Sequence, residues 1–130
     1  MTDLRATILV GEDEPEIRRF LRSALGADGY RVVEAGSGAE ALQVWEQHPN
    51  SIDLLLTDVV MPGGMSGREL AVKLMGSHPR LKIIFASGYN VEENNTDFFR
   101  PGGATFLQKP YTRVDLAKAV RTALDQKSPE

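Results

Sequence analysis

Reactive side chains follow four short apolar runs of the sequence. Acids follow the first two runs, a hydroxyl follows the third and an amine follows the fourth. The endings are Glu12 and Asp13 after residues 7–11, Asp58 after 54–57, Ser87 after 81–86 and Lys109 after 104–108. Turn propensity explains any one of these endings, because Asp and Ser are common in turns. It does not readily explain three acids, a hydroxyl and a lysine together.

These side chains meet if the apolar runs are neighbouring parallel strands. The continuous apolar run before Asp58 is typical of a strand buried on both faces. Open parallel α/β sheets bind their ligands at the carboxyl ends of the strands. We therefore expect Glu12, Asp13 and Asp58 to lie within a few ångströms of one another.

Carboxylates at that spacing need compensation. Two like charges ~4 Å apart repel by about 4 kcal/mol at an effective dielectric near ~20, so the cluster needs a counter-charge, a raised pKa or a cation. Carboxylate oxygens without His or Cys suit Mg2+. Asp58 can then act as a nucleophile and form an acyl phosphate. Mg2+ and Lys109 would neutralise the phosphoryl oxygens, and the Ser87 hydroxyl would hydrogen-bond one of them.

The composition indicates one globular domain over residues 1–130, with its core at about residues 6–126. A net charge of -3 gives no electrostatic case for nucleic acid or an acidic membrane surface. The sequence has no cysteine, which excludes disulfides and thiolate chemistry. No stretch approaches the ~18 apolar residues of a membrane span, and the first residues do not resemble a signal peptide. We expect a cytoplasmic protein.

Strand and helix patterns alternate along the chain. Strands are predicted at residues 7–11, 30–35, 52–57, 81–86 and 104–108, with a helical pattern after each. The helical pattern is weakest at residues 91–100, where we predict a short or mobile fourth helix. This alternation predicts an α/β fold, a doubly wound parallel sheet with helices on both faces.

Capping residues and apolar spacing predict where the helices begin and which face is buried. Ser37 with Glu40, and Ser66 with Glu69, have the spacing of a capping box, and Thr112 is predicted to cap the last helix. The residues predicted to face inward are Ile17, Phe20, Leu21, Ala24 and Leu25, then Leu70, Ala71, Leu74 and Met75, and finally Val114, Ala117, Val120 and Leu124.

Taken together, the chain resembles a receiver (response regulator) domain of two-component signalling. The matching pieces are the pair Glu12 and Asp13, Asp58 with Met61 and Pro62, Ser87 with Gly88, and Lys109 with Pro110. The sequence around Asp58 and Ser87 is similar to that of receivers of hybrid sensor histidine kinases and of stand-alone receivers. The resemblance implies a CheY-like, flavodoxin-like (βα)5 fold with five parallel strands in the order 2-1-3-4-5, the order that is the family's own.

The resemblance also implies residue roles. Asp58 would be the phospho-acceptor, taking a phosphoryl group in a Mg2+-dependent reaction. Glu12 and Asp13 would hold Mg2+, with Asp13, Asp58 and the backbone carbonyl of Val60 as ligands. Lys109 would contact the phosphoryl group, and the Lys109–Pro110 bond would be cis.

The implied output is a conformational switch. Ser87 would be the switch hydroxyl and Phe106 the switch aromatic, at a position where the family often has Tyr. The donor would be a phosphohistidine of a sensor histidine kinase or a histidine phosphotransfer protein. A downstream protein would bind the fourth helix, fifth strand and fifth helix, with no direct role for nucleic acid or membrane.

Two other functions stay open at this point. A phosphohydrolase with an aspartyl-phosphate intermediate commonly has a second aspartate two residues after the nucleophile as general acid, but Val60 occupies that position. A phosphorylation-independent pseudo-receiver would need a damaged site, and the predicted site is intact. We therefore predict a signalling domain, with at most self-phosphorylation and self-dephosphorylation, and no turnover enzyme.

Overall fold

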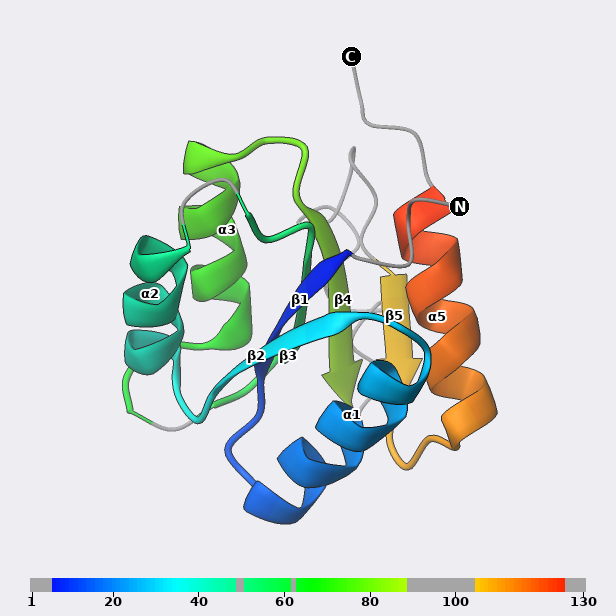
Figure 1. Ribbon diagram of the computed structural model, residues 1–130. Coiled ribbons are helices and arrows are strands. Elements are labelled where there is room, and N and C mark those ends of the chain that lie inside the picture. The colour runs from blue at the N-terminus through cyan, green and yellow to red at the C-terminus, as the bar shows by residue number, and fades with distance from the viewer. Residues whose placement is uncertain (1–5, 49–50, 62, 89–104, 126–130) are drawn as a thin grey trace.

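Five parallel strands form the centre of the computed structural model, in the order β2-β1-β3-β4-β5 (Figure 1). The structure describes residues 6–48, 51–61, 63–88 and 105–125. The strands are β1 (Thr7–Gly11), β2 (Arg31–Ala35), β3 (Leu54–Asp58), β4 (Lys82–Ser87) and β5 (Thr105–Gln108). Both the parallel sheet and the predicted strand order are confirmed.

The helices cover both faces of the sheet. Figure 1 shows α2 (Gly38–Gln47) and α3 (Gly67–Ser77) on one face, and α1 (Pro15–Ala27) and α5 (Arg113–Asp125) on the other. The predicted helix at 91–100 lies outside the described residues. Within the described ranges, every helix is too short or too polar to cross a membrane.

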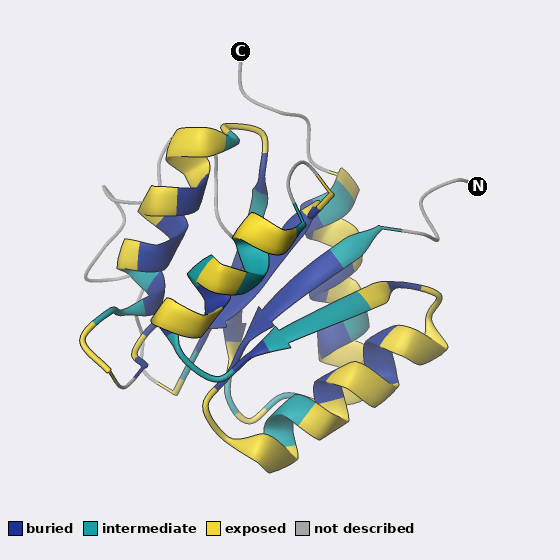
Figure 2. Cartoon of the chain, turned by 60° about the vertical axis from the view of Figure 1, so that its left-hand side comes forward, coloured by how far each residue is buried: buried dark blue, intermediate teal, exposed yellow. Residues whose placement is uncertain are grey.

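The sheet separates two apolar cores. Leu9, Leu55 and Phe85 face the α2 and α3 layer. Their neighbours along the strands, such as Ile8 and Leu54, face the α1 and α5 layer. This alternation follows from the two-residue period of a strand. Because both faces are covered, all five residues of β3 are buried, as the dark central strands of Figure 2 show.

Three residues predicted to face inward are exposed. Phe20, Met75 and Val114 have exposed fractions of 38%, 38% and 64%. Phe20 and Met75 lie at the margins of the apolar stripes of α1 and α3, where helical spacing alone does not distinguish the flank from the centre. Val114 lies on the exposed face of α5, because the buried stripe of that helix consists of Leu116, Ala119, Val120 and Ala123.

Helix capping follows the sequence in two cases and departs from it in a third. Ser66 and Glu69 form the complete reciprocal capping box of α3. Thr112 Oγ1 accepts a hydrogen bond from the backbone amide of Asp115 at 3.0 Å. At α2, Ser37 caps the amide of Glu40, but Glu40 Oε1 accepts from the amide of Gly36 at 2.7 Å. The predicted capping box of α2 is therefore only half formed.

Gly67 allows α3 to begin directly against the end of β3. A Cβ atom at this position would overlap the backbone carbonyl oxygen of Asp58. The amide of Gly67 also donates a hydrogen bond to the carbonyl of Val59 at 2.8 Å. Because Gly67 has no side chain, the start of α3 can pack directly against the backbone of Asp58.

Gly67→Ala is expected to lower the free energy of unfolding by about 2 kcal/mol or more, because the added methyl must displace backbone. Gly76→Ala in the same helix is the matched control. A Cβ at Gly76 meets nothing within 4 Å, so this variant should gain roughly 0.5–1 kcal/mol from helix propensity. Urea unfolding measures both changes, and equal stabilities of the two variants would contradict the proposed steric role.

Candidate functional site

Three acids converge at the carboxyl edge of the sheet. Asp58 ends β3, and Glu12 and Asp13 directly follow β1, its neighbour in the sheet. One carboxylate oxygen from each lies within 4.8 Å of those of the other two. Glu12 is 2% exposed and Asp58 6%, while Asp13 faces solvent. The predicted acidic cluster is therefore present, with its solvent-facing side at Asp13.

Lys109 supplies the positive charge of the site. Its Nζ lies 2.7 Å from Asp58 Oδ1 and 3.2 Å from Glu12 Oε1. The contact with Glu12 has hydrogen-bond geometry. The contact with Asp58 is an ion pair. One ammonium group thus bridges the two buried acids.

The cluster shifts the pKa of Asp58 upward. Burial raises the pKa of this carboxyl to about 7, with Lys109 opposing the rise and the charge of Glu12 adding to it. Burial alone would lower the pKa of Lys109, but the contact with Asp58 and the charge of Glu12 raise it above its usual value. Lys109 therefore stays charged at neutral pH, whereas Asp58 is easily protonated when no further positive charge is nearby.

Ser87 ends β4, the strand between β3 and β5, and Phe106 lies on β5, the strand that Lys109 directly follows. Asp58 pairs in register with Ala86, so Ser87, the last residue of β4, lies one step further along the same edge. The carbonyl of Ser87 accepts a hydrogen bond from the amide of Lys109 at 2.9 Å. The ring of Phe106 on β5 is half-buried and lies 6.1 Å from that of Phe85.

The loop after β3 and the segment after β5 complete the edge. Val60 is exposed, with 68% of its surface accessible. The Lys109–Pro110 bond is cis, as expected from the resemblance. The structure therefore brings Glu12, Asp13, Asp58 and Lys109 into one cluster, with Ser87 and Val60 at its border.

Two residues beside the cluster, Arg18 and Tyr111, were not predicted from the sequence. The Arg18 side chain donates a hydrogen bond to the backbone carbonyl of Glu12 at 2.7 Å. Tyr111 packs its ring 6.2 Å from that of Phe20, and burial, aided by the charge of Glu12, raises its pKa to about 12. Neither position has a motif of its own, although Arg18 lies one helical turn into α1 and is spaced to reach back to the loop.

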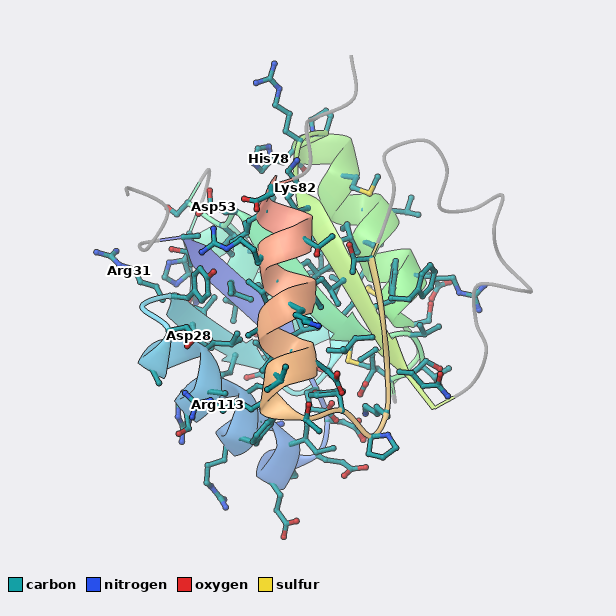
Figure 3. All side chains as sticks on the ribbon, turned by 90° about the vertical axis from the view of Figure 1, so that its right-hand side faces the viewer. Asp28, Arg31, Asp53, His78, Lys82 and Arg113 are labelled. Carbon is teal, nitrogen blue, oxygen red and sulfur yellow. The ribbon has the colours of Figure 1, made fainter. Side chains whose placement is uncertain are left out.

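The opposite edge of the sheet carries other charged residues. Asp53 and Lys82, labelled in Figure 3, lie at the amino ends of β3 and β4. Asp53 Oδ2 accepts a hydrogen bond from the amide of Thr7 at 2.9 Å, and its own amide donates to the carbonyl of Thr7. Asp53 therefore helps to join β1 to β3 and lies far from the acidic cluster.

The acidic cluster has the groups needed to bring a cation and an anion together. Carboxylates from two strand ends can bind a divalent cation, and oxygen donors of this kind suit Mg2+. The Lys109 ammonium on the other side can bind an anionic group beside Asp58. Lys109 lies closer to Asp58, at 2.7 Å, than to Glu12, at 3.2 Å.

Comparison with known proteins shows close relatives over most of the chain. Among curated proteins, the receiver protein CpdR of Brucella abortus is 40% identical over 117 residues, covering 90% of this chain and 95% of CpdR. The sensor kinase CckA of the same organism is 39% identical over 127 residues, covering 96% of this chain. The chain spans only 13% of the length of CckA.

Solved structures show the same fold. The receiver domain of the hybrid histidine kinase CckA is 38% identical, with a TM-score of 0.77 over 92% of this chain and 100% of that domain. A receiver domain protein from Clostridium thermocellum is 32% identical, with a TM-score of 0.82 over 92% of this chain and 94% of that one. The family model described as the response regulator receiver domain matches residues 8–121. The chain therefore belongs to the response regulator receiver domains of two-component signalling.

Proposed function

We propose that Asp58 is the phospho-acceptor of this receiver. The observation that carries the proposal is the contact of its buried carboxylate with Lys109 Nζ at 2.7 Å, beside two further acids. A carboxylate nucleophile attacks a phosphorus atom and forms an acyl phosphate as the bond to the donor breaks. For a phosphohistidine donor, the bond that breaks is the phosphorus–nitrogen bond, and the imidazole leaves.

A divalent cation, Mg2+ above all, fits the acidic cluster. The donors are carboxylate oxygens within 4.8 Å of one another, with no sulfur or imidazole among them, which is the ligand chemistry that Mg2+ prefers. We assign Asp13 and Asp58 as direct ligands with the backbone carbonyl of Val60, and Glu12 as a supporting acid. When bound, the ion neutralises charge on the phosphoryl oxygens.

Lys109 has two roles in this proposal. Before phosphorylation, its ammonium balances the charges of Asp58 and Glu12. After phosphorylation, the Asp58 oxygen that forms the acyl phosphate carries less charge, and the ammonium can move toward the phosphoryl oxygens. The amide of Lys109 is hydrogen-bonded to the carbonyl of Ser87. A movement of Lys109 would therefore also displace the end of β4.

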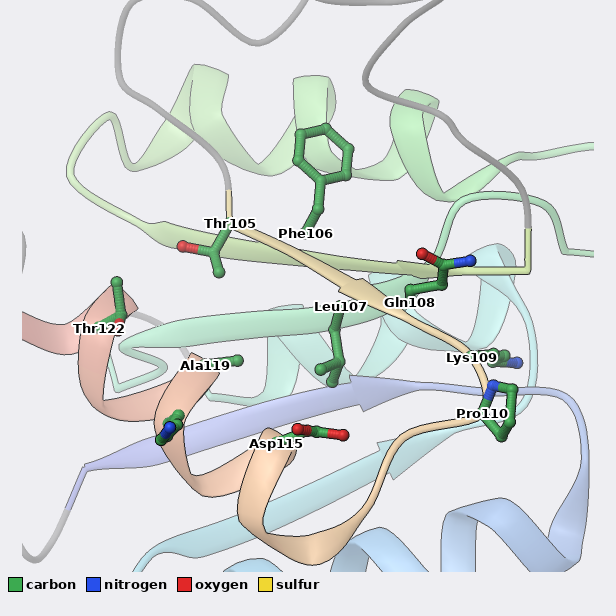
Figure 4. Close-up of a pocket in the computed structure, with 10 residues that line it drawn as sticks. Thr105, Phe106, Leu107, Gln108, Lys109, Pro110, Asp115, Ala119 and Thr122 are labelled. Carbon is green, nitrogen blue, oxygen red and sulfur yellow. The ribbon is translucent and has the colours of Figure 1, made fainter.

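Ser87 and Phe106 are proposed as the relay from the site to a partner surface. The Ser87 hydroxyl would hydrogen-bond a phosphoryl oxygen, and Phe106 would turn inward as it moves. Figure 4 shows the described part of this surface, a groove between β5 and α5. Phosphorylation would shift a pre-existing equilibrium between two conformations of this surface.

The proposed partners follow from the chemistry. The donor is a phosphohistidine on a sensor histidine kinase or a histidine phosphotransfer protein, and the acceptor of the signal is a protein that binds the β5 and α5 face. Among the relatives, CckA is a sensor kinase and CpdR is a receiver protein. In either kind of protein, we propose that this receiver works in the cytoplasm. The domain acts by changing conformation, so at most it adds and removes its own phosphoryl group.

Phosphorylation at Asp58 is tested with a small acyl phosphate and Mg2+. Intact-mass measurement should show the gain of one phosphoryl group on the wild type and none on Asp58→Asn. Asp53→Asn is the matched control, because it makes the same charge change at the opposite edge of the sheet and should be phosphorylated like the wild type.

The same experiment separates the other functions. Release of many phosphates per protein would indicate a phosphohydrolase. A folded wild type that gains no phosphoryl group and binds no Mg2+ would indicate a pseudo-receiver. A phosphoryl gain that persists in Asp58→Asn would place the acceptor elsewhere.

Without divalent cations, the pKa of Asp58 predicts a pH-dependent stability. The folded carboxyl holds a proton that the unfolded chain releases near pH 4, and it loses this proton near pH 7. The free energy of unfolding should therefore fall as the pH rises from about 4 through about 7. Asp58→Asn should lack this fall and be more stable than the wild type at pH 8, by roughly 1–3 kcal/mol.

Chemical unfolding in the presence of a chelator measures this effect. Asp53→Asn should keep the pH dependence of the wild type. Added Mg2+ should restore the stability of the wild type at pH 8 and leave Asp58→Asn nearly unchanged, because the ion needs the ionised carboxylate. Parallel pH profiles for wild type and Asp58→Asn would contradict the assigned ionisation.

The relay is tested with Ser87→Ala and beryllofluoride, a phosphoryl mimic. In amide NMR spectra with Mg2+, the wild type should shift at Asp58, at Phe106 and along α5. Ser87→Ala should keep the shift at Asp58 and lose most of the shift at Phe106, because the link from the phosphoryl oxygen is absent. Equal shifts in both proteins at Phe106 would remove Ser87 from the relay.

A further inference from the structure

The backbone carbonyl of Glu12 is bonded by a side chain six residues later. Glu12 lies between the end of β1 and the start of α1, so its carbonyl belongs to neither the sheet nor the helix ladder. The Arg18 Nη1 atom donates to this carbonyl at 2.7 Å. A short bond from a charged donor is stronger than one between neutral groups. Arg18 therefore supplies the partner that regular secondary structure does not.

This bond acts on the direction of Asp13. The Glu12 carbonyl and the Asp13 amide belong to one rigid peptide plane. The other groups of Glu12 are also held, since its amide donates to the carbonyl of Ala35 at 3.0 Å and its Oε2 accepts from the amide of Glu14 at 3.1 Å. With the carbonyl bonded as well, the amide, the side chain and the carbonyl of Glu12 are all held. The peptide plane between Glu12 and Asp13 is then restrained from rotating, which would turn Asp13 away from the cluster.

The guanidinium of Arg18 is itself held in place. Its Nε lies 3.6 Å from Glu34 Oε1 on β2, and the same glutamate binds Arg22 at 2.7 Å. A Cβ at Gly36 would lie 3.1 Å from Arg18 Nη1, so the glycine leaves the space that the guanidinium fills. The Arg18 side chain is only 26% exposed. These contacts fix one end of the bond to the acidic loop.

We propose that Arg18 is a positioning residue for the divalent cation, acting through the Glu12 carbonyl on the peptide that carries Asp13. The inference rests on the proposed Mg2+ site. Arg18 touches neither the cation nor a phosphoryl group, and its own positive charge opposes cation binding. Its effect through position and its effect through charge therefore have opposite signs, which makes the two separable.

Arg22 provides the matched control. It binds the same Glu34 and has the same charge, but Arg18 is the one bonded to Glu12. Arg22→Ala removes a distant positive charge and should leave the affinity for Mg2+ unchanged or slightly higher. Arg18→Ala removes a nearer positive charge as well as the bond, and it should weaken Mg2+ binding by about tenfold, the low end of the effect of losing an outer-shell contact at a metal site.

The test is calorimetric titration of Mg2+ into the wild type, Arg18→Ala, Arg18→Lys and Arg22→Ala. Unfolding in a chelator is measured in parallel, so that a loss of affinity is compared at known stability. Arg18→Lys keeps the charge and one donor and should recover part of the affinity. In the Mg2+-free NMR spectrum, the amide of Asp13 should shift in Arg18→Ala and keep its position in Arg22→Ala.

The outcomes distinguish this inference from the function beneath it. A wild type that binds no Mg2+ would overturn the proposed site itself. A wild type that binds Mg2+ together with an Arg18→Ala variant of equal or higher affinity would overturn the positioning role alone, since charge would then be the whole effect. Equal losses in Arg18→Ala and Arg22→Ala would also overturn it and assign the effect to the Glu34 ion pairs.

Discussion

The site depends on one ammonium group that holds buried carboxylates together. Glu12 and Asp58 lie at the carboxyl ends of adjacent strands and are both nearly inaccessible, an arrangement that like charges oppose. Lys109 bridges them at 3.2 and 2.7 Å from the far side of β4. The sheet order makes this possible, because Lys109 follows β5, which lies two positions from β3. The negative charge that remains at the cluster supports the proposed cation site beside Asp13.

Much of the fold and of the site was predictable from the sequence, because both depend on a general property of parallel sheets. Reactive side chains at the ends of apolar runs must share one edge once the strands are parallel, and this placed Glu12, Asp58 and Lys109 together. The capping box of Ser66 and Glu69 was predictable for a similar reason, since both partners lie within one helical turn. The strand order, by contrast, came from the family resemblance.

Contacts between elements were not predictable in this way. The bond from Arg18 to the Glu12 carbonyl depends on how α1 leaves β1, and an arginine on a polar helix face has no distinguishing pattern. The need for Gly67 arises from the approach of α3 to Asp58, which sequence spacing does not encode. The Glu40 carboxylate accepts a hydrogen bond from the amide of Gly36 instead of that of Ser37, because the loop before α2 places the Gly36 amide within its reach. The inward positions predicted for Phe20 and Met75 were wrong because neighbouring elements set the margins of an apolar stripe. The prediction for Val114 was wrong because the small residues Ala119 and Ala123 belong to the buried face of α5 and turn it away from Val114.

The division of the interior by the sheet has an evolutionary consequence. Side chains of the α2 and α3 layer and those of the α1 and α5 layer form separate clusters, so substitutions in one layer share few partners with those in the other. The free-energy effects of such substitutions should be close to additive. A lineage can therefore change the packing of the α1 and α5 layer while the packing behind α2 and α3 is inherited unchanged. The two layers can thus evolve as nearly independent units within one small domain.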